Sequence, residues 1–308
     1  MVELILESCF LVYFWCGGSV AFLLLWLLFV IPYTPTIVKD LSMYGKVMSA
    51  RNKTIIENLI QVPKSYFKHF YLTSVIANGY LLWTLVNVYF LNGHIPSWYL
   101  WCLNKLTYYP VNNPTVSHLS VILMVSIIVV QGLKRFIECI TLSKYSKATM
   151  NVAHYILGLT FYFFSGLTVL SEAPDLSKPV PFSGPVELFH GLRWYHIAAV
   201  ALYTWSSIHQ YNVHKIFANL RKSDKDKNVH KIPYGDWFLY VSCPHYFFEI
   251  LIYTAGILML GFQHRMWYML YAFVVTNQVA ASYTVHQWYR TKFEDYPKDR
   301  MAVIPFIY

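Results

Sequence analysis

The sequence predicts an all-α polytopic membrane protein, a bundle of seven transmembrane helices that forms a single domain over residues 1–308. The first observation is composition: 56% of the residues are hydrophobic and only 13% are charged, about half the charged share of a typical soluble domain. The second is that the hydrophobic residues come in long blocks. A helix that crosses a bilayer needs about 18 or more consecutive, mostly apolar residues, and these blocks are long enough.

Residues that end or interrupt helices separate the expected spans. No basic segment precedes the first apolar run and no small-residue cleavage site follows it, so residues 1–32 are expected to be a retained anchor and not a signal peptide. Later connections carry proline, glycine and asparagine, as in "NGHIPSW", "YYPVNNPT" and "SEAPDLSKPVPFSGP". The spans are expected at about 9–31, 69–91, 117–142, 150–170, 194–219, 237–262 and 266–290.

The lysines and arginines predict the orientation of the bundle. Twenty of the 24 fall in the first, third and fifth connections and in the C-terminal tail, if those at helix ends are assigned to the nearer side. Because such residues collect on the cytoplasmic side, the N-terminus is expected to be luminal and the C-terminus cytoplasmic. Asn52, in the sequon Asn52-Lys53-Thr54, should then stay unmodified. The net charge of +9 is attributed to this topology and to anionic lipid headgroups, not to a nucleic-acid partner.

Polar residues interrupt four of the spans at helical spacing. Ionisable groups inside a bilayer are costly and usually face the interior of the bundle, so they are candidate functional residues. Glu249 is expected to lie deepest, twelve residues beyond Trp237 or about 18 Å along a helix. The four stripes are expected to converge on one cavity open to the cytoplasm, although each residue alone could simply join helices by hydrogen bonds. The stripes are Gln131, Arg135 and Glu138; Gln210, His214 and Arg221; Ser242, His245 and Glu249; and Gln278, Ser282, His286 and Tyr289.

Basic residues beside the ends of these stripes could hold phosphate groups, or they could be ordinary cytoplasmic-side residues. They are Lys144, Arg221, Lys222 and Lys231. The sequence has no histidine box, no HExxH, no GxSxG and no GxGxxG. Neither a metal site nor a Rossmann domain is therefore expected, and any nucleotide would have to be held by the helices themselves.

Two segments resemble a family signature. "NLRKSDKDKNVHKIPYGDWFLYVSCPHYFFE" (219–249) and "HQWYRTKFEDYPKDRMAVIPFIY" (286–308) resemble the C-terminal reductase region of the steroid 5α-reductase family, about residues 150–308 here. "QVPKSYFKHFY" (61–71), "QGLKRFIEC" (131–139) and "IPYGDWF" (232–238) resemble its polyprenol/polyprenal reductase branch, the type 3 branch. The resemblance implies a multi-pass reductase of the endoplasmic reticulum membrane. Such an enzyme binds NADPH from the cytosolic side and reduces a conjugated double bond of a long-chain polyprenal or polyprenol, a step of the dolichol synthesis that supports protein N-glycosylation.

The resemblance also implies roles for individual residues. Glu249 falls at a family glutamate near the nicotinamide, and His245, where steroid-reducing relatives have asparagine, is expected to orient the nicotinamide with it. A primary amide needs both a donor and an acceptor, and this pair can offer both. Cofactor-binding roles are implied for Arg135, Lys144, Gln210, His214, Arg221, His245, Glu249 and Tyr289.

Two positions depart from the steroid-reducing members, which hold a 3-keto group with a Gln-Glu pair and a tyrosine. Here Gln61 is followed by Val62, and the tyrosine position falls at Gly132. Polyprenal is therefore expected as the substrate more than a steroid. An aldehyde is favoured over the alcohol because the charge that develops on hydride addition can move to its oxygen. Candidates for the acid that protonates C2 are Glu138, His286 and Tyr289.

Alternative functions stay open at this point. A 3-oxo-5α-steroid 4-dehydrogenase would share the motifs, a receptor or transporter could share the seven spans and the luminal N-terminus, and a prenyl-cysteine methyltransferase would share a helical architecture but bind S-adenosylmethionine. The expected partners are the lipid substrate and membrane lipids. The polyisoprene tail is expected to leave the cavity sideways into the bilayer, and the chain is expected to act as a monomer.

Overall fold

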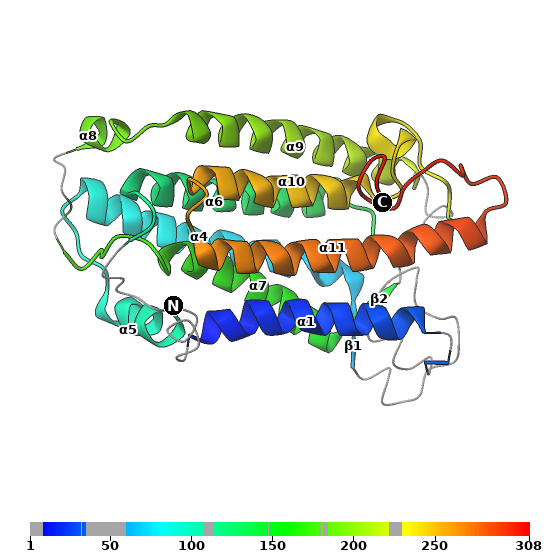
Figure 1. The fold of residues 1–308 in the computed structure, drawn as a ribbon, viewed down its shortest axis with the longest axis horizontal. Coiled ribbons are helices and arrows are strands. Elements are labelled where there is room, and N and C mark those ends of the chain that lie inside the picture. The colour runs from blue at the N-terminus through cyan, green and yellow to red at the C-terminus, as the bar shows by residue number, and fades with distance from the viewer. Residues whose placement is uncertain are drawn as a thin grey trace.

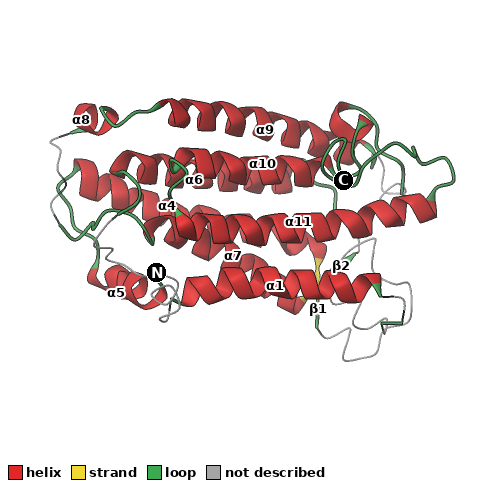
Figure 2. Cartoon of the chain, viewed as in Figure 1, coloured by secondary structure: helices red, strands yellow, loops and turns green. Residues whose placement is uncertain are grey.

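The computed structural model describes residues 9–31, 33–34, 60–107, 114–146, 148–178, 180, 184–221 and 230–308. In these ranges seven long helices lie side by side, and successive helices run in opposite directions (Figure 1). Two short helices, α5 (Ser97–Leu106) and α8 (Pro185–Phe189), lie at one end of the bundle, opposite the end that carries two short strands (Figure 2). The long helices are α1 (Phe10–Val30), α4 (Phe67–Phe90), α6 (His118–Thr141), α7 (Val152–Leu170), α9 (Trp194–Asn219), α10 (Pro244–Met259) and α11 (Arg265–Lys292).

The apolar composition of these helices places the chain in a membrane. Within the described ranges, α1, α6 and α7 are each long and apolar enough to cross a bilayer. The prediction of a helical, polytopic membrane protein is therefore confirmed. That all seven long helices span the membrane, and that the N-terminus is luminal, stay predictions. Asn52, which was to test the orientation, lies outside the described residues.

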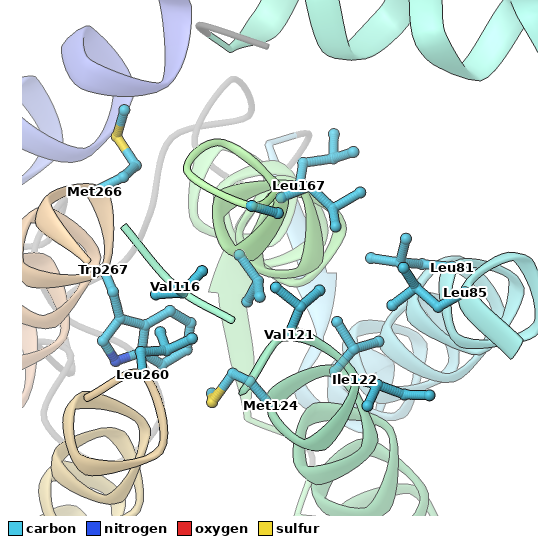
Figure 3. Close-up of a cluster of buried hydrophobic side chains, with 14 of the residues drawn as sticks. Leu81, Leu85, Val116, Val121, Ile122, Met124, Leu167, Leu260, Met266 and Trp267 are labelled. Carbon is cyan, nitrogen blue, oxygen red and sulfur yellow. The ribbon is translucent and has the colours of Figure 1, made fainter. Parts of the chain in front are cut away.

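A cluster of buried apolar side chains lies at the α5–α8 end of the bundle. Figure 3 shows apolar side chains of α4, α6, α7 and α11 that point toward one another there. Leu85, Met124, Leu167 and Trp267 each expose 4% of their surface or less. Burial of these apolar side chains joins the helices at that end. The buried stripe residues Gln131, Glu138, Gln210 and His286 lie in the other half of their helices.

Two short strands tie the beginning of α4 to the connection between α6 and α7. Strand β1 (Gln61–Pro63) pairs antiparallel with β2 (Thr149–Asn151). The residue after β1, Lys64, donates its backbone N–H to the carbonyl of Ala148 at 3.0 Å and begins the 3₁₀ turn η3 (Lys64–Tyr66). The strand pairing therefore holds Lys64 beside the segment that follows α6.

The sixth helix begins later than predicted. Gly235, at φ +93°, adopts a backbone conformation that glycine tolerates best, and a 3₁₀ turn, η5 (Asp236–Leu239), follows it. Helix α10 starts only at Pro244, a residue suited to a first helical turn because its missing N–H would have no partner there. The prediction of a helix from residue 237 is therefore wrong. Glu249 lies only five residues into α10, so the expected depth of about 18 Å is wrong as well.

The C-terminal tail is hydrogen-bonded to residues 240–243, the segment that connects η5 to α10. Met301 donates its backbone N–H to the carbonyl of Tyr240 at 3.0 Å, and Ser242 and Cys243 donate theirs to Met301 and Ala302 at 2.8 and 3.1 Å. These bonds and the bridge between Val241 and Met301 hold residues 241–243 outside α10, so Ser242 does not share a helix face with the α10 residues of its predicted stripe. The two segments that carry the family resemblance, far apart in sequence, thus pack directly on each other (Figure 1).

Candidate active site

A cavity of about 600 Å³ lies toward the end of the bundle that carries the strands, within the usual size range of ligand pockets. Side chains from all seven long helices and from the adjoining connections line it. Eight predicted site residues are among those that line it: Arg135, Lys144, Gln210, His214, Arg221, His245, Glu249 and Tyr289. The structure thus brings together residues that are up to 154 positions apart in the sequence.

Arg135 on α6 is the centre of a charged network beside the cavity. Its guanidinium donates to the carboxylate of Glu138 and, through Nη2, to the hydroxyl of Tyr71 at 3.1 Å. The Nδ1 atom of His214 lies 2.8 Å from Glu138 Oε2 and 2.7 Å from Arg135 Nη1. Glu138 is only 3% exposed and is not among the described residues that line the cavity. It therefore contacts the cavity only through Arg135 and His214.

A chain of side-chain amides connects α6 and α9 to Glu249 on α10. Gln131 Nε2 donates to Gln210 Oε1 at 3.0 Å, and Gln210 Nε2 donates to Glu249 Oε2 at 2.5 Å. Lys134 Nζ also donates to Gln210 Oε1, at 3.2 Å. Because both ends of the Gln210 amide are engaged, its orientation is fixed, and it fixes in turn the carboxylate of Glu249 at the cavity wall.

Four basic side chains line the part of the cavity next to η3 and to the connections after α6 and α9, which we call its mouth. Lys64, Lys144, Arg221 and Lys231 all line it, and Arg221 Nη1 donates to the backbone carbonyl of Lys144 at 2.6 Å. Lys222, which was expected in the same group, lies outside the described residues. A cluster of positively charged side chains is suited to bind phosphate groups.

Lys64 is a residue of this mouth that sequence reasoning missed, because it was counted only as a cytoplasmic-side lysine. Burial, together with the positive charge of Arg221, lowers the pKa of Lys64 to about 8. The signal in the sequence was its position directly before an expected span, in "QVPKSYF". Its approach to Arg221 depends on the pairing of β1 with β2, which no local pattern predicts.

The predicted stripe on α11 is divided between two places. Gln278 and Tyr289 line the cavity. His286 is buried and is not among the described lining residues; its Nδ1 lies 2.6 Å from the hydroxyl of Ser242, which also lies 2.6 Å from the hydroxyl of Tyr296. Tyr296 in turn stacks on Tyr289 at a centroid distance of 5.2 Å. His286 therefore joins α11 to the 240–243 segment and to the tail, and its neighbour one turn later, Tyr289, faces the cavity.

The inner end of the cavity is aromatic and apolar. Phe22 from α1, Phe161 from α7, and Phe273 and Val274 from α11 line it, and the Phe273 ring packs on those of Phe22 and Phe161 at 5.1 and 5.6 Å. The cavity thus joins a cationic mouth and a polar middle to an apolar end. Within the described ranges, no group of three His, Cys, Asp or Glu side chains is placed to hold a metal ion.

Comparison with known proteins identifies the family. Residues 148–308 match the family described as 3-oxo-5-alpha-steroid 4-dehydrogenase. The polyprenal reductase of Homo sapiens is 36% identical over 302 residues, which cover 96% of this chain and 94% of that protein. The polyprenal reductase of Xenopus tropicalis is 36% identical over 278 residues, 89% of each chain, and that of Danio rerio is 35% identical over 274 residues, 88% of this chain and 87% of the other.

The similarity to these reductases extends over most of the chain. It agrees with the motif-based prediction of a polyprenal reductase branch and makes the protein an oxidoreductase. The chain belongs to the 3-oxo-5-alpha-steroid 4-dehydrogenase family, that is, the steroid 5α-reductase family.

Proposed function

We propose that this protein is an NADPH-dependent reductase of the α-isoprene double bond of polyprenal, which yields dolichal for dolichol synthesis. The observation that carries the proposal is the cavity, in which a cationic mouth, a polar middle and an apolar end follow one another. A dinucleotide phosphate requires the first two features and a prenyl chain requires the third. The relatives with high coverage are named polyprenal reductases.

The donor set of the cavity fits NADPH. Lys64, Lys144, Arg221 and Lys231 would hold its phosphates, and His245 and Glu249 would hold the carboxamide of its nicotinamide, with Gln210 fixing the Glu249 carboxylate. Arg135 and His214 would complete the polar wall between these two ends. When bound, the cofactor supplies a hydride to C3 of the substrate.

The substrate aldehyde would enter the polar middle from the apolar end. Phe22, Phe161 and Phe273 would contact the first isoprene units, and the rest of the tail would leave between α1, α7 and α11 into lipid. Of the three residues proposed to supply the proton at C2, Tyr289 lines the cavity, Glu138 lies behind Arg135, and His286 is bonded to Ser242. Tyr289 therefore has the most direct access.

We place the protein in the membrane of the endoplasmic reticulum with the mouth of the cavity toward the cytosol. The described basic residues of these connections that line the cavity, Lys64, Lys144, Arg221 and Lys231, lie toward the end of the bundle that carries the strands (Figure 1), which supports this orientation. Cytosolic NADPH would then reach the site without crossing the bilayer.

The direct test supplies purified protein in lipid nanodiscs with NADPH and either polyprenal, polyprenol or a 3-keto-4-ene steroid. We expect a saturated aldehyde from polyprenal, detected by mass spectrometry, and no turnover of the steroid. Turnover of the steroid with none of polyprenal would instead establish the steroid dehydrogenase. Thermal stabilisation by S-adenosylmethionine but not by NADPH would establish a methyltransferase.

The pKa of Lys64 predicts a pH dependence of cofactor binding. Below about pH 8 Lys64 carries its charge, and it loses that charge as the pH rises further. Because a bound phosphate favours the charged form, NADPH affinity should be full at pH 7 and several-fold weaker at pH 9, as measured by cofactor fluorescence. Lys64→Arg should keep its affinity at pH 9, since arginine stays protonated. An equal fall in wild type and Lys64→Arg would assign the pH dependence to another group.

A further inference from the structure

We propose that Tyr71 is the residue that activates the substrate carbonyl, by donating its phenolic hydrogen bond to the aldehyde oxygen. This rests on the proposed function and deepens it. Neither the sequence motifs nor the three candidate proton donors assign a group to the aldehyde oxygen, and hydride addition to C3 requires one, because the displaced electron pair must be stabilised there.

Tyr71 lies at the wall of the cavity, in the first turns of α4. Its side chain lines the cavity, and the residue is only 8% exposed. The Arg135 guanidinium lies over its ring, 4.9 Å from the centroid, and Tyr162 packs edge-on against it at 5.2 Å. Two neighbours therefore hold the ring in place. A hydroxyl that donates to a reacting oxygen must be fixed in this way.

The hydrogen-bonding roles at this hydroxyl are set by chemistry. A guanidinium can only donate, so in the 3.1 Å contact with Arg135 Nη2 the Tyr71 oxygen is the acceptor. The phenolic hydrogen is then left to donate elsewhere, and the cavity is beside it. The arginine charge also polarises the phenol, so that the hydroxyl becomes a stronger donor to an oxygen on which negative charge develops.

The packing of α4 against α6 explains why the hydroxyl comes from α4. At Gly132 on α6, a Cβ atom would lie 2.7 Å from Ser74 Oγ and 3.0 Å from Ser74 Cβ. The two helices are thus too close at this level for a tyrosine on α6, which is where the steroid-reducing relatives are expected to carry theirs. Tyr71 lies one turn from Ser74 on the same helix and reaches the cavity beside Arg135, which is itself one turn from Gly132.

Tyr71 lines the same cavity as Glu249, the residue proposed to hold the nicotinamide. A substrate carbonyl bonded to Tyr71 would therefore be near the hydride donor. The C3–H bond forms from the hydride that NADPH supplies, the C2=C3 pair becomes a C1=C2 bond, and the carbonyl pair moves to oxygen, where the Tyr71 hydroxyl stabilises the enolate. The C1=O bond then re-forms as C2 takes a proton from the separate acid, so atoms and electrons balance.

The test compares Tyr71→Phe with Tyr89→Phe, which removes the hydroxyl of another buried tyrosine of α4, bonded to His118 at 3.1 Å and not among the described residues that line the cavity. We expect Tyr71→Phe to lower kcat for polyprenal roughly 100-fold, a usual effect of losing one oxyanion donor, and Tyr89→Phe to stay within about threefold of wild type. NADPH-induced thermal stabilisation should be unchanged in both. Equal losses in both variants, or a loss of NADPH stabilisation in Tyr71→Phe, would overturn the proposal.

Fluorotyrosines at position 71 test the hydroxyl without removing the Arg135 contact. They change the acidity of the phenol with little change in size, so kcat should vary systematically with phenol pKa at position 71 and not at position 89. A flat response at both positions would exclude Tyr71 as the donor. If wild-type protein reduces no polyprenal, the proposed function itself fails, which is distinguishable from an active enzyme that is indifferent to Tyr71.

Discussion

Replacing Glu249 with glutamine is expected to weaken NADPH binding about 10- to 100-fold and to leave the folded protein intact. The carboxylate accepts from Gln210 and lines the cavity, where it is proposed to accept from the nicotinamide carboxamide. Hydrogen bonds to a charged group contribute about 1.5–3 kcal/mol, which corresponds to that loss. Titration of NADPH fluorescence measures the affinity, and the thermal midpoint without cofactor measures the fold.

Glu172 offers a matched control for this substitution. It is a glutamate at the opposite end of the bundle, where its carboxylate accepts from Thr115 and from the backbone N–H of Met266 at 2.9 and 2.7 Å. Glu172→Gln should leave NADPH affinity at the wild-type value. Unchanged affinity in Glu249→Gln as well would show that Glu249 does not contact the nicotinamide.

Replacing Arg135 with methionine is expected to destabilise the protein by about 3–5 kcal/mol, the usual cost of leaving a buried charge without its partner. Glu138 would keep its negative charge at 3% exposure with only the 3.5 Å contact to Lys134 and the His214 contact remaining. The measurement is thermal or denaturant unfolding in a fixed detergent.

A second substitution separates the charge effect from a packing effect. Arg135→Met combined with Glu138→Gln removes both charges and should recover a substantial part of the lost stability, because the buried Glu138 carboxylate no longer lacks its arginine partner. A double variant as unstable as Arg135→Met alone would mean that the arginine stabilises the protein by packing on Tyr71 and not by neutralising Glu138.

The helices could be predicted from the sequence because their signal is local. Six of the seven expected spans agree with the observed helices to within a few residues, since a long apolar run can satisfy its backbone in a bilayer only as a helix. The prediction for the sixth span was wrong at its N-terminal end, because α10 begins at Pro244 and not at residue 237. Residues 237–243 are as apolar as a span, but Gly235, Pro244 and the returning tail determine their conformation, and the tail acts across about 60 residues of sequence.

Part of the site could also be predicted, because some of its residues give a local signal in the sequence. Arg135, Gln210 and Glu249 were found because each interrupts an apolar run, which is costly unless the residue faces other polar groups. Lys64 and Tyr71 were missed because neither is unusual where it occurs: lysine is ordinary beside a span, and tyrosine is ordinary near its end. Only the pairing of β1 with β2 and the close packing at Gly132 bring these two side chains to the cavity.

The aromatic inner end of the cavity determines which part of the substrate the enzyme can recognise. About 600 Å³ shared with a dinucleotide leaves room for the head of a prenyl chain and a few of its units, and the remainder must lie among the acyl chains of the bilayer. A site built in this way distinguishes the substrate by its head group and is indifferent to its length. The distribution of dolichol lengths in the cell would then be decided wholly by the enzyme that elongates the chain, and the reductase would copy that distribution unchanged into its product.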